Sequence, residues 1–137
     1  MFLIMVVLLF CISCRKEQVS EPVQVTPYQF WRSQNLHSYS INQRRSCFCP
    51  DGGEVVRITV RSDTISSIIR VSDTSVVTNP FYLTVDSLFG IIRNCETDSL
   101  VVRYNKQYGY PEYLDMNPQL HPVDGGVLYE TSNLQIR

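Results

Sequence analysis

Residues 55–71 read VVRITVRSDTISSIIRV, and this stretch decides the fold. Its first half alternates apolar and polar residues with the two-residue period of a half-buried strand, and the apolar positions are Val56, Ile58 and Val60. Ser62-Asp63 predicts a tight turn into a second strand over residues 64–71. On that strand we expect one apolar face, made of Ile65, Ile69 and Val71. The pattern therefore predicts an antiparallel hairpin.

Further strands are predicted on both sides of this hairpin. Residues 37–49 alternate before it, and the turn Asp51-Gly52-Gly53 connects the two; one face of this strand would carry Tyr39, Ile41, Gln43, Arg45, Cys47 and Cys49. A polar loop over residues 72–80 follows the hairpin. Three later strands are expected over residues 99–105, 112–117 and 127–136, with turns at Tyr108-Gly109-Tyr110-Pro111 and Asp124-Gly125-Gly126.

Two helices complete the pattern. Thr26-Pro27 predicts a helix start, with a run to about residue 36 in which Phe30 and Trp31 are buried. A second helix starts at Thr84 and ends at residues 96–98; its apolar face is made of Val85, Leu88, Phe89, Ile92 and Cys95. The order is helix, three strands, helix, three strands. It predicts an α+β domain in which two helices pack on an antiparallel sheet.

Composition narrows the function classes. The chain has 137 residues, 12 Lys+Arg against 13 Asp+Glu, and a formal net charge of −1. This balance argues against a nucleic-acid-binding protein, which usually needs a strongly basic face. With 44% apolar and 18% charged residues, the chain has the composition of a folded domain. A single short apolar stretch excludes a polytopic membrane protein.

The apolar stretch lies at the N-terminus. Residues 1–10 are apolar without a break, and Cys11-Ile12-Ser13-Cys14 follows, which resembles a bacterial lipobox. Small Ser13 suits cleavage before Cys14, whereas bulky Phe10 makes Cys11 the poorer candidate. A short uncleaved membrane anchor is the alternative. We therefore expect a lipoprotein signal peptide at 1–13, lipidation of Cys14, a flexible tether over 14–25 and a domain over 26–137.

The expected location follows from this assignment. A lipid on Cys14 would anchor the chain to a membrane of the cell envelope. Residue 15 is Arg rather than Asp, and resemblance to the sorting habit of some Gram-negative bacteria then favours the outer membrane.

Three motifs of the domain occur in a familiar order: Cys47-Phe48-Cys49-Pro50, the helix start at residues 84–89, and residues 101–105 before Tyr108-Gly109-Tyr110-Pro111. The set resembles a bacterial domain family of unknown function found in predicted lipoproteins and secreted proteins. The resemblance covers about residues 28–136. Val85 and Asn105 replace the usual Ile and Asp, and Cys95 is an addition of this chain. The resemblance implies no activity.

Three cysteines of the domain are candidates for disulfide or redox chemistry. In an extended strand Cys47 and Cys49 would have Cα atoms about 6.6 Å apart, near the upper limit for a disulfide. A direct bond would need a bulge or strain, and an exposed one could be redox-active. Alternatively, Cys95 could bond either strand cysteine and stabilise the fold by roughly 4 kcal/mol. Zinc binding with His37 or His121 has no supporting spacing.

Other residues are candidates for a binding surface. Tyr108 and Tyr110 either form a turn and core or offer an aromatic pair to a ligand. Arg57, Arg61 and Arg70 could share an exposed sheet face that grips an anionic partner, with Arg44 and Arg45 also basic in this half. Three carboxylates have simpler explanations: Asp86 interacts with a helix dipole, Asp115 is expected in solvent, and Asp124 belongs to a turn. No spacing brings two of them together for catalysis.

The sequence thus favours a non-catalytic binding module tethered to a membrane, with an envelope protein or a glycan as partner. A thiol-disulfide redox protein using Cys47 and Cys49, or an inhibitor of an extracellular enzyme, are the alternatives. No cofactor or metal is expected, because no phosphate loop, nucleophile elbow or zinc-binding helix motif is present, and the charge balance argues against nucleic acid.

Overall fold

The computed structural model describes residues 24–49, 52–78, 81–95, 97, 99–123 and 125–137. The expected signal peptide, Cys14 and residues 15–23 of the tether lie outside the described residues. So do Asp51, Asp124, Glu96 and Asp98 of the expected turns and helix end. Within the described part of the chain, no helix has the length and apolar character needed to cross a bilayer.

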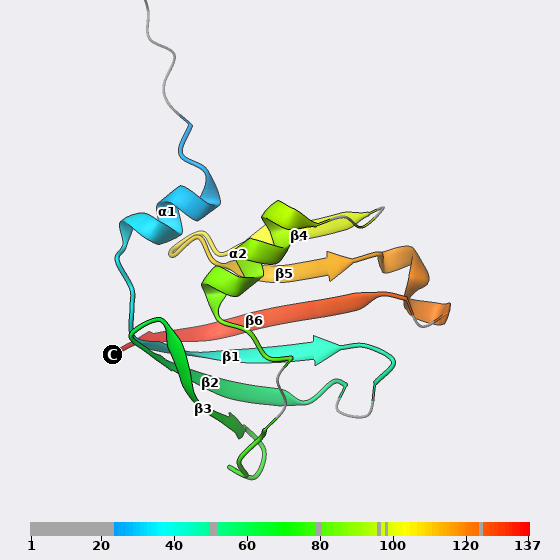
Figure 1. Cartoon of the computed structure of the whole chain (residues 1–137), viewed down its shortest axis with the longest axis horizontal. Helices are drawn as coiled ribbons and strands as arrows, with labels where there is room; N and C mark the ends of the chain where they lie inside the picture. The colour runs from blue at the N-terminus through cyan, green and yellow to red at the C-terminus, as the bar shows by residue number, and fades with distance from the viewer. Residues whose placement is uncertain (1–23, 50–51, 79–80, 96, 98, 124) are drawn as a thin grey trace, which may run out of the picture.

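The domain is one open sheet of six antiparallel strands with two α-helices, as the sequence predicted (Figure 1). Along the chain the elements are α1 (Pro27–Ser33), β1 (Tyr39–Ser46), β2 (Val55–Arg61), β3 (Thr64–Arg70), α2 (Val85–Asn94), β4 (Leu100–Tyr104), β5 (Pro111–Met116), the 3-10 helix η1 (Pro118–Val123) and β6 (Val127–Ile136). The strand order in the sheet is β3-β2-β1-β6-β5-β4. The final strand therefore joins the two halves by pairing with both β1 and β5.

Both helices lie on the same face of the sheet. Trp31 of α1 packs edge-on against Tyr39 of β1 and against Tyr110, the residue before β5, while Tyr28 of α1 contacts Phe89 of α2. The sheet residues under the helices are the apolar ones that the alternation predicted, and Val56, Ile58 and Val60 are fully buried. Burial of these side chains is the main stabilising contribution to the domain.

Buried polar side chains of β1 hold the start of α2 on the sheet. The Tyr39 hydroxyl accepts a hydrogen bond from the Val85 backbone N–H at 3.0 Å, which satisfies a donor that a helix start leaves without a partner. The Gln43 amide donates to the Leu83 carbonyl and accepts from the Leu83 N–H. Thr84 caps the helix, as predicted, by accepting from the Ser87 N–H. Burial raises the pKa of Tyr39 well above its usual value.

A β-bulge in β3 overturns part of the predicted alternation. Thr59 pairs with Ser67 but Val60 pairs with Ile65, so Ser66 is the extra residue, and its hydroxyl donates to the Thr59 carbonyl at 3.1 Å. The extra residue shifts the inward positions by one. Ile65 and Ile68 therefore face the helices. The prediction that Ile69 and Val71 share this face was wrong.

Three other boundaries differ from the prediction. Helix α2 ends at Asn94 and not at residues 96–98, so Cys95 follows it in extended conformation and is not part of its apolar face. Helix α1 ends at Ser33 and not near residue 36, and it buries Trp31 but leaves Phe30 39% exposed. Strand β1 ends at Ser46, so Cys47 and Cys49 lie in the bend that follows it. The bend is fixed by two backbone hydrogen bonds, from Gly53 to the Arg45 carbonyl and from Gly52 to the Cys49 carbonyl.

Candidate functional site

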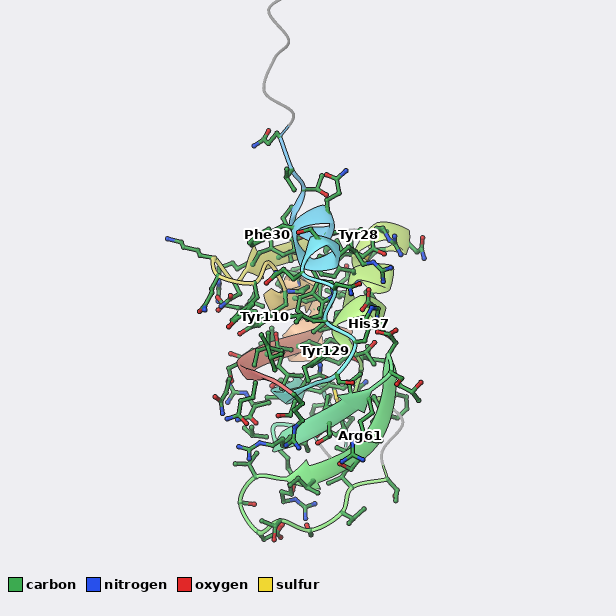
Figure 2. All side chains as sticks on the ribbon, turned by 90° about the vertical axis from the view of Figure 1, so that its left-hand side faces the viewer. Tyr28, Phe30, His37, Arg61, Tyr110 and Tyr129 are labelled. Carbon is green, nitrogen blue, oxygen red and sulfur yellow. A yellow bond between two sulfur atoms is a disulfide. The ribbon has the colours of Figure 1, made fainter. Side chains whose placement is uncertain are left out.

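The face of the sheet opposite the helices carries polar and charged side chains across five strands. Strand alternation brings to it Arg57 and Arg61 of β2, and strand register aligns these with Asn42, Arg44, Glu130, Ser132, Tyr113, Asp115 and Arg103 of the neighbouring strands. Figure 2 shows Arg61 projecting from the β2–β3 half of the molecule, away from α1. We call this set the open face.

Side chains of the open face contact one another from strand to strand. Arg44 makes an ion pair with Glu130 directly opposite it on β6, and Arg57 Nε donates to Asn42 Oδ1 at 3.2 Å. Arg103 lies over the Tyr113 ring, 3.9 Å from its centroid. A shallow groove of about 380 Å³ runs along this band and is lined by Asn42, Gln43, Arg44, Val55, Glu112, Glu130, Thr131 and Ser132.

Asp115 lies on this face but is not solvated, which corrects the sequence-based expectation. Only 4% of its surface is exposed, because Val101 of β4 and Leu128 of β6 flank it at the same register. It accepts a hydrogen bond from the Tyr113 hydroxyl at 2.9 Å. That bond to a carboxylate raises the pKa of Tyr113.

Arg70 does not share the open face with Arg57 and Arg61, contrary to the prediction. The bulge at Ser66 places Arg70 opposite Val56, on the helix side of the sheet. There its guanidinium pairs with Glu54 at 2.8 Å and with Asp73 at 3.4 Å, and the Glu54 hydrogen bond raises the pKa of Arg70. Hydrogen bonds from Ser75 lower the pKa of Asp73. Arg70 thus stabilises the end of β3.

The Tyr108–Pro111 segment is a turn whose second tyrosine belongs to the core. Gly109 has a φ of 78°, and a Cβ there would come within 2.8 Å of the Phe30 side chain, so the turn fits closely under α1. Tyr110 is only 3% exposed, and burial raises its pKa. Of the two tyrosines offered as an aromatic pair, only half-buried Tyr108 reaches the surface.

The structure pairs Cys47 with Cys49 in a disulfide, with a Cα–Cα distance of 5.3 Å. The bend after β1 brings the two residues closer than an extended strand would. Gly52 packs against this bend, where a Cβ would lie 2.6 Å from the Cys47 carbonyl oxygen. Cys95 is a free thiol 2.8 Å from the Thr97 hydroxyl. Since Cys47 and Cys49 are bonded to each other, the alternative of a bond from Cys95 to either of them is wrong.

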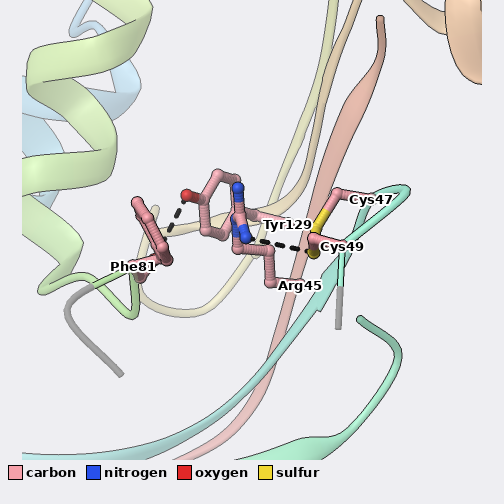
Figure 3. The surroundings of a disulfide bond; sticks show 5 residues. All are labelled: Arg45, Cys47, Cys49, Phe81 and Tyr129. Carbon is pink, nitrogen blue, oxygen red and sulfur yellow. Dashed lines mark hydrogen bonds between the residues drawn. A yellow bond between two sulfur atoms is a disulfide. The ribbon is translucent and has the colours of Figure 1, made fainter. Parts of the chain in front are cut away.

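Arg45 lies against this disulfide (Figure 3). Its Nη1 is 3.3 Å from Cys49 Sγ, and its guanidinium lies 4.6 Å from the centroid of the Phe81 ring. The Tyr129 hydroxyl donates to the Phe81 carbonyl at 3.2 Å and fixes that segment on β6. Phe81, whose backbone Tyr129 anchors, thus helps to hold the Arg45 guanidinium beside Cys49 Sγ.

The remaining candidates that the structure describes lie in separate parts of the domain. His37 contacts Asp63 and Asn35 before the start of β1, at the opposite end of that strand from Cys47. Asp86 accepts from Trp31 and Arg32. Among the described residues, no three His, Cys, Asp or Glu side chains gather closely enough to hold a metal ion. The side chain of His121 and Asp124 lie outside what the structure describes.

Sequence reasoning missed the roles of Gln43, Arg45 and Glu130. A signal existed for Gln43, because it occupies an inward position in an otherwise apolar alternation, where an amide has to find backbone partners. Arg45, two residues later, is likewise a polar residue at an inward position, so the same signal existed for it. Glu130 had none, because its contact with Arg44 depends on β6 pairing with β1 across 86 residues.

These features define a class of small α+β domains in which helices cover one face of the sheet, the other face is open, and a disulfide-bonded bend follows the first strand. Within that class, the chain belongs to a family of unknown function, DUF6174, whose match covers residues 18–136. No curated protein and no solved structure matches the chain significantly.

Proposed function

We propose that this protein is a non-catalytic binding module, tethered to a membrane of the cell envelope through Cys14, whose open face binds an acidic surface of another envelope protein. The observation that carries the proposal is the sheet itself. Its two helices cover one face, and the other presents Arg57 and Arg61, which form no ion pair with the described carboxylates.

The charge distribution indicates where the partner would be held. Glu130 neutralises Arg44 in the middle of the face, so the positive charge without an ion pair among the described residues lies toward its two edges, on Arg57 and Arg61 of β2 and on Arg103 of β4. Arg57 and Arg61 are four residues apart on one side of that strand, which separates them by about 13 Å. Two cations at this spacing suit carboxylates distributed over a protein surface, and they favour fast, salt-dependent association.

A glycan is the less suitable partner for this face. Sugars commonly stack on an exposed aromatic ring. Tyr113 is the aromatic residue that the open face presents, and Arg103 already covers its ring. The residues that line the groove beside it include no aromatic ring on which a sugar could stack.

The proposed tether adds to the affinity of such an interaction. Eleven residues separate Cys14 from Thr26, and the twelve residue-to-residue steps of a fully extended chain span about 40 Å. A domain confined this close to a bilayer meets membrane partners at a raised effective concentration. A weak face-to-face contact is then sufficient for function.

The test is cross-linking of the tagged full-length protein in its native cells, followed by identification of what co-purifies. The double variant Arg57→Glu/Arg61→Glu reverses the charge of the face. Lys106→Glu is the matched control, because Lys106 is exposed in the turn between β4 and β5. We expect a single envelope protein with wild type and Lys106→Glu, and its loss with the double variant.

Other outcomes contradict defined parts of the proposal. Capture that survives the double variant removes the open face as the binding surface. Enrichment of polysaccharide in place of protein makes the partner a glycan. A Cys14→Ala version that stays equally bound to membranes contradicts the lipid tether.

A further inference from the structure

Arg45 is a partly buried cation to which the described part of the chain supplies no counter-charge. Its Nε is buried and has no hydrogen-bond partner, and none of the described carboxylates forms an ion pair with it. Its Nη1 is directed instead at Cys49 Sγ. An unpaired charge that is partly removed from water is unfavourable. A negative charge on Cys49 would satisfy it, and a disulfide does not supply that charge.

The disulfide is poorly placed to serve as a structural staple. Its cysteines are separated by one residue, so it closes a minimal loop. The entropic stabilisation by a disulfide grows with the length of the loop it closes, and is smallest here. The bend is already fixed by the hydrogen bonds of Gly52 and Gly53. Both cysteines are half-exposed, and Phe48 between them is 82% exposed, so another protein can reach the bond.

We propose that Cys47 and Cys49 form a thiol-disulfide exchange site, and that Arg45 stabilises the Cys49 thiolate of its reduced form. The co-reactant is an envelope protein that carries a dithiol. This inference goes beyond the proposed binding function and does not depend on the open face.

The exchange balances in two steps. A thiolate of the partner attacks Cys47 Sγ, the Cys47–Cys49 bond breaks, and its electron pair stays on Cys49 as a thiolate beside Arg45. The second partner thiol gives its proton to solvent and attacks the partner sulfur of the mixed disulfide. Cys47 leaves as a thiolate and takes up a proton. The partner is oxidised to a disulfide by two electrons, and the Cys47–Cys49 pair is reduced by the same two.

The contacts of Arg45 explain how the charge would be kept in place. Phe81 lies against one side of the guanidinium, and Tyr129 fixes the Phe81 backbone. A cation held at hydrogen-bond distance favours the thiolate over the thiol and so lowers the pKa of the leaving cysteine. Stabilising the reduced form makes the disulfide a stronger oxidant.

The test measures the equilibrium of this pair in the full-length protein. The chain is incubated in glutathione buffers of set thiol-to-disulfide ratio, alkylated, and the fraction of oxidised Cys47–Cys49 peptide is read by mass spectrometry, which separates it from the other cysteines. Arg45→Met removes the cation. Arg44→Met removes the same charge one residue earlier, on the opposite face of β1.

We expect the wild-type pair to be reduced within the glutathione range, and Arg45→Met to shift its equilibrium constant about tenfold toward the disulfide. Arg44→Met should shift it by less than about twofold. In the reduced protein, the pH at which Cys49 alkylation is half-maximal should rise in Arg45→Met. Equal equilibria for the two variants, or a wild-type pair that stays oxidised throughout, would overturn the proposal.

Two further variants keep the test decisive if Arg45→Met does not fold. Arg45→Lys retains a cation, and its alkylation pH profile should stay close to that of wild type; a profile that matches free cysteine contradicts the role of the charge. Cys49→Ser leaves Cys47 unable to complete the exchange. In the reverse direction of the exchange, its Cys47 thiolate attacks the disulfide of the oxidised partner, one partner thiolate leaves, and no Cys49 thiol remains to displace the partner sulfur from Cys47. This mixed disulfide should accumulate in native cells, and finding none contradicts the exchange step.

Discussion

The two faces of the sheet use polar side chains in different ways. On the helix-covered face, Tyr39 and Gln43 bind backbone groups at the start of α2 and so hold one element onto another. On the open face, Arg44 with Glu130 and Arg103 with Tyr113 bind other side chains of the same sheet. The first arrangement stabilises the fold, whereas the second mainly sets the pattern of charge that a partner would meet.

The same strands produce both faces, because successive residues of a strand point to opposite sides. On β2, Ile58 is completely buried on the helix-covered face. The neighbouring Arg57 instead donates a hydrogen bond to Asn42 on the open face. A substitution on one side of a strand should therefore change stability, and one on the other should change recognition. Four predictions test how complete this separation is.

The largest effect is expected for Trp31→Ala on the covered face. Trp31 is 2% exposed and contacts Tyr39, Tyr110 and, through its indole N–H, Asp86. Truncating a large buried aromatic residue leaves a cavity and costs about 3–5 kcal/mol of unfolding free energy. Urea denaturation measures this loss. Phe30→Ala, one residue earlier on the exposed side of α1, should cost less than half as much; equal losses would show that the face does not decide the effect.

The second effect is expected for Gln43→Leu, which keeps the volume but removes the amide. The Leu83 N–H and carbonyl then lose their partners, and the cost should be about 1–3 kcal/mol. Hydrogen exchange at the start of α2 should accelerate more than exchange in β4. Gln135→Leu is the control, since Gln135 is exposed on β6. A Gln43→Leu protein as stable as wild type would mean that packing alone seats α2.

The third prediction compares two tyrosines on opposite faces in alkali. Burial raises the pKa of Tyr39, and the bond to Asp115 raises the pKa of Tyr113. A raised folded-state pKa contributes stability that is present below the unfolded value near 10 and is lost as the pH rises through the folded value. Above pH 10, the unfolding free energy of Tyr39→Phe should therefore decrease less steeply with pH than that of Tyr113→Phe. Denaturation curves recorded at a series of fixed pH values measure this slope. Equal slopes for the two variants would contradict the difference in environment.

The sequence predicted the covered face better than the open one, for a physical reason. Apolar periodicity reports burial, so Val56, Ile58, Val60 and the Val85–Leu88–Phe89 side of α2 were predicted correctly. Local chemistry also predicted both N-caps, Thr26 and Thr84, because a cap depends on residues three positions away.

What the sequence did not predict depends on register and on distant pairing. One bulge residue, Ser66, moved Arg70 off the face that was expected to hold it with Arg57. Asp115 was expected in solvent, but neighbours from two other strands bury it. The disulfide likewise depended on where β1 ends, since a strand continued through Cys49 would hold the cysteines near the geometric limit.

The smallest expected effect lies at the centre of the open face, in the ion pair of Arg44 and Glu130. Both side chains are about one-third to one-half exposed, with values of 45% and 33%, so water screens their attraction. A double-mutant cycle with Arg44→Ala and Glu130→Ala should give a coupling of about 0.2–1 kcal/mol, and about 0.5 M salt should reduce it further. A coupling above about 2 kcal/mol would place this pair among the interactions that stabilise the fold. In that case the open face would be a structural surface like the covered one, and binding would have to be sought elsewhere on the domain.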